Sequence, residues 1–112
     1  MAAPNQGRYP RQNLNGEWIV GNDFLRGILE GSVNALTASI DQRRANIADN
    51  NSYVDMLTDL LAHKQFRRGD AAHLEQSIAD IGHDSERLRG EVANLQERLR
   101  IARETLAGLG AA

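Results

Sequence analysis

The chain has 112 residues, of which 13 are basic and 15 acidic, so its formal net charge is −2. This length allows one small domain at most, and two Phe, two Tyr and one Trp are too few to fill an ordinary globular core. The near balance of charge excludes a general attraction for nucleic acid, an anionic membrane or an acidic substrate. The lack of cysteine excludes disulfides and thiolate metal sites.

Residues 1–21 are rich in Asn, Gln, Gly and Pro and predict an extended N-terminal arm without a core of its own. The arm has one apolar patch, formed by Trp18, Ile19 and Val20. We expect these three residues to bind a protein partner by ordering in a groove. The alternative, equally open at this point, is that Trp18 folds back on the helices of its own chain.

A first helix is predicted over residues 23–67, capped by Asn22 or Asp23. From residue 33 onward it has a heptad pattern with one largely β-branched core row and one partly polar core row. The first row is Val33, Ile40, Ile47, Val54 and Leu61, and the second is Leu36, Arg43, Asn50, Leu57 and Lys64.

The turn after this helix is predicted at residues 68–70. Lys64, Arg67 and Arg68 are typical of a helix C-terminus, and Gly69 can adopt the left-handed conformation that ends a helix. Asp70 is a good N-cap for the next helix. Residues 68–70 also spell the tripeptide of integrin-binding loops, but capping already explains all three of them.

The second helix is predicted over residues 71–107 and has the clearest pattern in the chain. Apolar or small residues follow one another at steps of four and three in a narrow stripe. They are Leu74, Ile78, Ile81, Ser85, Leu88, Val92, Leu95, Leu99, Ala102, Leu106 and Leu109. Because such a stripe cannot be buried on a lone helix, the sequence predicts an all-α fold: a long antiparallel helical hairpin, paired as a coiled coil over residues 22–112, with an extended N-terminal arm.

The two heptad patterns also predict how the helices align. One register places Leu61 against Leu74 and Leu36 against Leu99, with apolar pairs between them, and brings Asn50 against Ser85 as a paired polar layer. In this register Arg43 faces Val92, with its guanidinium free to reach water or a neighbouring Glu. A register shifted by one heptad places Asn50 against the apolar Val92, where its amide has no partner, and is therefore disfavoured.

Side chains outside the stripes predict association with further helices. Met56, Leu60 and Ile101 stay partly uncovered in a two-helix hairpin, so we expect a homo-oligomer. The run Ile47, Ala48, Asp49, Asn50 resembles the trimeric stalks of some surface adhesins and fibres. That resemblance implies an alternative in which three parallel chains associate along the first helix.

The sequence gives no indication of catalysis or of a bound cofactor. The histidines at 63, 73 and 83 do not share a helical face, and Asp80, His83 and Asp84 share one without a fourth ligand, so no metal site is expected. We find no phosphate loop, placed nucleophile or carboxylate pair, and we expect no enzyme activity and no small-molecule substrate. The arginines of the second helix are interleaved with acidic residues, unlike a DNA-binding basic region.

The functional expectation is a non-enzymatic structural or adaptor subunit that oligomerises through its helices and docks on a larger assembly through its arm. A virion or appendage component, such as a fibre, collar or decoration protein, suits this layout. The alternative is a small nucleic-acid-associated regulator or assembly chaperone. Residues 1–11 lack the apolar run of a secretory signal, and no uncharged apolar stretch is long enough to span a bilayer, so we expect a soluble protein whose compartment is open.

Overall fold

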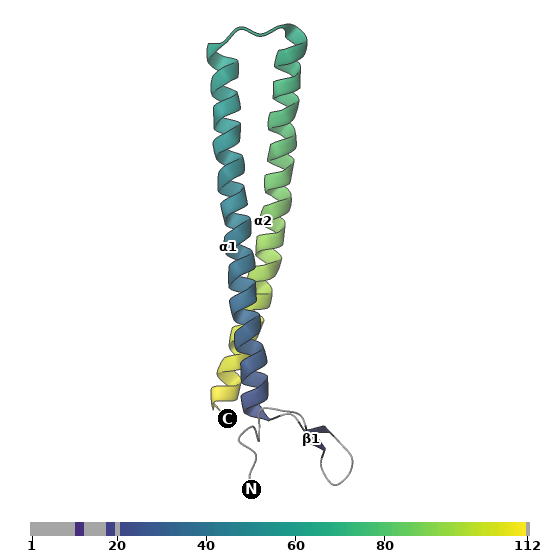
Figure 1. The fold of residues 1–112 in the computed structure, drawn as a ribbon, viewed down its shortest axis with the longest axis vertical. Coiled ribbons are helices and arrows are strands. Elements are labelled where there is room, and N and C mark those ends of the chain that lie inside the picture. Colours follow the sequence, from purple (N-terminus) through teal and green to yellow (C-terminus); the bar gives the residue numbers. More distant parts are fainter. Residues whose placement is uncertain (1–10, 13–17, 20, 112) are drawn as a thin grey trace. The chain divides into compact units, whose positions relative to one another are not determined.

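The computed structural model describes residues 11–12, 18–19 and 21–111. Two long helices make up most of this part, α1 at Asn22–His63 and α2 at Arg68–Ala111 (Figure 1). Two short strands precede them, β1 at Arg11–Gln12 and β2 at Trp18–Ile19. The structure confirms the predicted all-α helical hairpin.

The described residues of the predicted arm form a small antiparallel strand pair. Arg11 lies opposite Ile19 and Gln12 lies opposite Trp18. Residues 11–12 and 18–19 are thus each extended, and backbone pairing joins them.

Helix α1 begins earlier than predicted. The amide of Leu25 donates to the carbonyl of Gly21 at 3.1 Å, which makes Gly21 the capping residue and places Asn22 and Asp23 in the first turn. In the first turn the carboxylate of Asp23 lies near the positive end of the helix dipole, and this interaction stabilises the helix start.

The turn between the helices lies at residues 64–67 and not at the predicted residues 68–70. The amide of Ala71 donates to the carbonyl of Arg67 at 2.9 Å, so Arg67 is the capping residue of α2. Arg68, Gly69 and Asp70 form the first turn of α2, and Gly69 does not have the predicted left-handed backbone. Asp70 was predicted to be the N-cap of this helix. It also fits the first turn, because a carboxylate is favourable anywhere near a helix N-terminus.

The helices contribute to two compact units. One contains Ser39–Leu95, that is, the later part of α1, the turn and the earlier part of α2. The other contains the start of α1, up to Ala38, together with the end of α2, from Gln96. Every pair of facing residues in the predicted register falls within one of these units.

The predicted stripes are the least exposed part of both helices. In the unit of residues 39–95 the buried side chains are Ile40, Leu57, Ser85, Leu88 and Val92, and in the other unit they are Leu99 and Ala102. The remaining stripe positions between 33 and 109 are half-buried, apart from Lys64, which is exposed. Among the described residues no side chain is fully enclosed, because each helix covers only one side of the other.

This burial predicts unequal costs for two truncations of the same type on α1. Ile40→Ala removes a side chain that is 4% exposed and should lower the free energy of unfolding by about 2–4 kcal/mol. Ile28→Ala, at a position 51% exposed, should change it by less than about 1 kcal/mol. Urea unfolding followed by circular dichroism measures both, and equal costs would contradict a core along the stripe.

Candidate functional site

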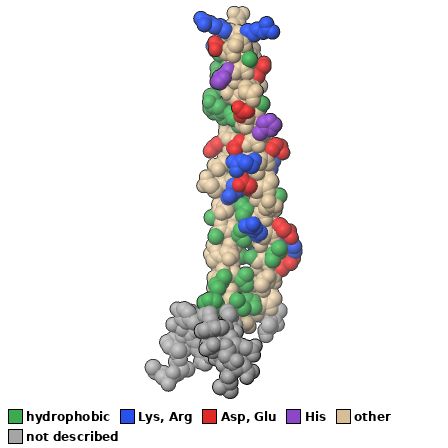
Figure 2. Space-filling model, turned by 90° about the vertical axis from the view of Figure 1, so that its right-hand side faces the viewer, with side chains coloured by type: hydrophobic (Ala, Val, Ile, Leu, Met, Phe, Trp, Pro, Cys, Tyr) green, Lys and Arg blue, Asp and Glu red, His purple; other side chains and the backbone are tan. Residues whose placement is uncertain are grey.

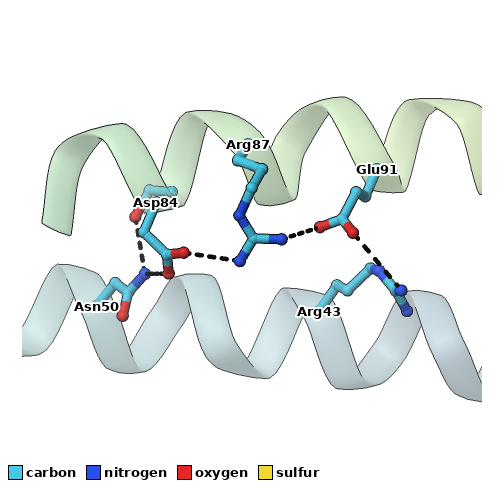
Figure 3. Close-up of polar contacts among 6 residues, drawn as sticks. Arg43, Asn50, Asp84, Arg87 and Glu91 are labelled. Atoms are coloured by element: carbon cyan, nitrogen blue, oxygen red, sulfur yellow. Dashed lines mark hydrogen bonds and ion pairs between the residues drawn. The ribbon is translucent and has the colours of Figure 1, made fainter. Parts of the chain in front are cut away.

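The two helices are joined in the unit of residues 39–95 by a polar crossing that starts at Asn50. The amide nitrogen of Asn50, on α1, donates to Asp84 Oδ2 at 3.0 Å and to Ser85 Oγ at 3.2 Å, both on α2 (Figure 3). Ser85 is 4% exposed and Asn50 is half-buried. The contact predicted between Asn50 and Ser85 is thus present, and it aligns the helices in the predicted register.

The crossing continues along α2 through two ion pairs. Arg87 donates to Asp84 Oδ1 at 2.7 Å and to Glu91 Oε2 at 2.8 Å (Figure 3). Glu91 in turn lies 3.8 Å from the guanidinium of Arg43 on α1, which makes a second bridge between the helices. We refer to Arg43, Asn50, Asp84, Arg87 and Glu91 as the polar ladder.

Arg43 occupies a stripe position that an apolar side chain would normally fill. It donates to the carbonyl of Ser39 at 3.2 Å as well as pairing with Glu91, as the sequence allowed. Its Nε atom is buried without a hydrogen-bond partner. A buried unpaired donor costs free energy, so this end of the polar ladder reduces stability.

The polar ladder shifts the ionisation of its members. Arg87, hydrogen-bonded to Asp84, and then the amide of Asn50 hold the pKa of the Asp84 carboxyl below its ordinary value. The same hydrogen bond, with the charge of Glu91, raises the pKa of Arg87. Both groups therefore stay charged over the whole neutral range.

Further ion pairs on α2 join residues three or four positions apart. Arg89 pairs with Glu86, and Arg100 pairs with Glu97 and Glu104. Hydrogen bonding to Arg100 lowers the pKa of Glu97. Figure 2 shows both signs of charge interspersed on the described surface, with hydrophobic side chains between them. These surface pairs contribute little stability each, but they neutralise the arginines locally.

An apolar area lies on α1 beside the polar ladder. Tyr53, Met56 and Leu60 are 51%, 47% and 36% exposed; we call these three residues the lateral patch. Met56 and Leu60 line a shallow hollow together with Asp59, His63 and Lys64. Large apolar side chains left in water at neighbouring positions are typical of an interaction surface.

A second open hollow lies where α1 and α2 face each other in residues 39–95. It is lined by Tyr53, Leu57, His73, Leu74, Ser77, Asp80 and Ile81. Tyr53 lines this second hollow and, as a member of the lateral patch, connects that patch with the side of α2.

The residues predicted to bind a partner are described only in part. Trp18 and Ile19 form strand β2, and Val20 lies outside the described residues. Of the candidate cation ligands, Asp84 is engaged by Asn50 and Arg87. Within residues 11–12, 18–19 and 21–111, no three histidine, aspartate or glutamate side chains group as metal ligands would.

Sequence reasoning missed the role of Asp84, which it had considered as a candidate metal ligand. The signal was available in the heptad positions, because Asp84 and Glu91 are seven residues apart and border the stripe next to Ser85 and Val92. Arg87 follows Asp84 by three residues and precedes Glu91 by four, the two spacings at which side chains on a helix can pair.

Comparisons with other proteins identify no relative of this chain: no family model matches it, and neither does any curated protein or solved structure. Within the described residues, neither helix has an apolar stretch that is long enough to cross a membrane.

Replacing Asn50 tests whether the polar layer sets the register. Asn50→Leu should keep or raise the helix content but permit a second alignment shifted by one heptad, because apolar layers are interchangeable. Spin labels at the exposed Ala48 and Ala79 report this directly, since the shift moves them apart along the axis by about 10 Å, seven residues at 1.5 Å each. We expect one distance in the parent and two in the variant.

The control is Asn51→Leu, at the exposed neighbouring position, which should keep the single distance. One unchanged distance in Asn50→Leu would show that the apolar contacts alone determine the alignment.

The lowered pKa of Asp84 predicts acid sensitivity. In the unfolded chain Asp84 takes up a proton near pH 3.9, so its contribution is complete above that pH and is lost as the pH falls through the lower folded value. Stability of the parent should therefore fall more steeply below about pH 4 than that of Asp84→Asn, in urea titrations. The exposed Asp55→Asn variant should follow the parent, and parallel curves for all three would exclude a role for Asp84.

Proposed function

We propose that this chain is a non-enzymatic structural or adaptor subunit whose helices associate with other copies and whose N-terminal arm docks on a larger assembly. Within one chain the stripes pair as an antiparallel coiled coil. A fibre, collar or decoration component of a virion or appendage is the kind of assembly that such a layout serves.

The observation that carries this proposal is the exposure of large apolar side chains on a hairpin only two helices thick. Ile28, Tyr53, Met56 and Ile101 are each about half exposed. Two helices cannot cover these side chains, because each helix faces the other on one side only. A copy of the chain that packs on any of these positions would remove the side chains there from water, at about 25 cal/mol per Å² of apolar surface.

The arm supports the docking part of the proposal. Strands β1 and β2 have two residues each, and a two-stranded pair of this size is too small to be stable by itself in water. A surface that covers Trp18, Ile19 and Val20 would supply the missing contacts, and the free edges of the strand pair could extend a partner's sheet.

The polar groups of the hairpin support a role without catalysis. The polar ladder gathers the most perturbed ionisable side chains of residues 39–95, and each of them is paired with another member or with Ser85 and Ser39. Such pairing serves helix alignment and leaves the carboxylates and guanidinium groups engaged with each other.

A nucleic-acid-associated regulator or assembly chaperone is the second candidate. The exposed arginines of α2 favour it, since Lys and Arg contacts to phosphate supply most non-specific affinity. The ion pairs of Arg87, Arg89 and Arg100 oppose it, because binding phosphate would require those pairs to break.

Sedimentation velocity of the purified chain over a range of concentrations tests the proposal. We expect the measured mass to exceed that of one chain once the protein concentration reaches tens of micromolar. A variant that begins at Asn22 should associate in the same way, because the helices carry the association. Duplex DNA should bind weakly at physiological salt. A monomer at all concentrations, with tight DNA binding that falls steeply with salt, would instead support the second candidate.

A further inference from the structure

Charged side chains flank the lateral patch at both ends. Asp49 precedes Met56 by seven residues and His63 follows it by seven, so the three share one side of α1 at intervals of two helical turns. Lys64 and Asp59 line the same hollow as Met56 and Leu60. Asp49, Asp59, His63 and Lys64 are all exposed. Along α1, the lateral patch thus has the Asp49 carboxylate on its N-terminal side, and the Asp59 carboxylate together with the Lys64 ammonium group on its C-terminal side.

This order of charges distinguishes between the two ways in which a second copy of α1 could cover the lateral patch. A parallel arrangement in register would place Asp49 against Asp49 and Lys64 against Lys64, which is repulsive at both ends. An antiparallel arrangement about a two-fold axis exchanges the ends and places the Asp49 carboxylate of each copy against the Lys64 ammonium group of the other. Self-complementary charge around an exposed apolar centre therefore favours the antiparallel pair.

We propose that the lateral patch is the contact between two copies of this chain, related by a two-fold axis that passes beside Met56 and Leu57. Tyr53 then packs against the partner's Leu60, and Asp49 pairs with the partner's Lys64, each contact occurring twice. A second copy fits the lateral patch because it brings Lys64 at the position that faces Asp49, and Asp49 at the position that faces Lys64. The inference rests on the proposed function and specifies the surface through which its self-association takes place.

The expected affinity follows from the size of the contact. Three exposed apolar side chains and one ion pair from each copy make a small interface, at the low end of specific contacts, so we expect a weak dimer. Self-association should therefore depend on concentration, and neighbouring contacts in a larger assembly would reinforce it.

Sedimentation equilibrium of the full chain and five variants tests the proposal. Met56→Glu places a charge at the centre of the lateral patch and should raise the dissociation constant more than tenfold. Ile101→Glu is the matched control, because Ile101 is 50% exposed, like Met56 at 47%, but lies on α2 outside the lateral patch. It should leave the dissociation constant unchanged. Circular dichroism should show the same helix content for all variants, since the altered side chains are exposed.

A charge exchange tests the antiparallel arrangement. Asp49→Lys alone and Lys64→Asp alone should each weaken the dimer about tenfold, because each creates two repulsive contacts across the axis. The double variant Asp49→Lys/Lys64→Asp should recover the affinity of the parent. Because the chain has no cysteine, M56C should also form a disulfide-linked dimer on oxidation, and I101C should not.

The outcomes separate this inference from the function on which it rests. Association that survives Met56→Glu but is lost in Ile101→Glu would overturn the lateral patch as the contact and leave self-association standing. A double variant as weak as its single parents would overturn the antiparallel arrangement. A parent chain that is monomeric at millimolar concentration would overturn both the contact and the proposed self-association.

Discussion

The hydrogen bonds from the amide of Asn50 to Asp84 and Ser85 are the contacts that distinguish one alignment of residues 39–95 from another. The apolar layers on either side are chemically alike from one heptad to the next, so sliding one helix by seven residues would exchange Leu, Ile and Val contacts at little cost. The polar layer differs, because a shift of one heptad would place Asn50 against Val92 and leave the buried Ser85 hydroxyl without the Asn50 amide. We therefore expect the rest of the pairing to follow from this polar layer.

The polar ladder, which aligns the helices, and the lateral patch, from which we infer association, are neighbours on α1. The polar ladder occupies the border of the stripe around Asp84 and Glu91, and Tyr53 begins the lateral patch one helical turn from Asn50. Charged groups that are paired within the chain are poor partners for another molecule, whereas half-exposed Tyr and Met side chains are good ones. Alignment and adhesion thus use neighbouring but different residues of α1.

Much of the fold follows from the spacing of apolar residues. The steps of four and three from Leu74 to Leu109 identify a helix with one buried stripe, and the complementary rows of α1 identify its partner, because a stripe of this width needs a second helix. The match of Asn50 with Ser85 follows from the same pattern once the chain is folded back on itself. Helix ends were less predictable: Gly69 and Asp70 fit a turn and a first helical turn equally well, and only the hydrogen bond between Ala71 and Arg67 decides between them.

The candidate site was only partly predictable, for a different physical reason. A stripe can be recognised from the residue types alone. The polar ladder cannot, because Asp84 and Glu91 on α2 contact Asn50 and Arg43 on α1 only in one register, which has to be known first. Met56 and Leu60 were expected to be uncovered, and they are exposed. Tyr53 was not singled out, because an aromatic residue beside a stripe can equally well fold over it.

The turn at residues 64–67 has a consequence for how the hairpin could be severed. Lys64, Phe66 and Arg67 are exposed and lie outside both helices, so a protease with trypsin-like preference meets accessible backbone there. One cleavage would yield two fragments that each retain a whole helix and every side chain of its stripe. What the cut removes is the tether, which keeps each helix at a high effective concentration for the other. The two fragments of a cleaved molecule would stay paired at high protein concentration and dissociate on dilution. The hairpin therefore needs an intact loop to remain folded at low concentration.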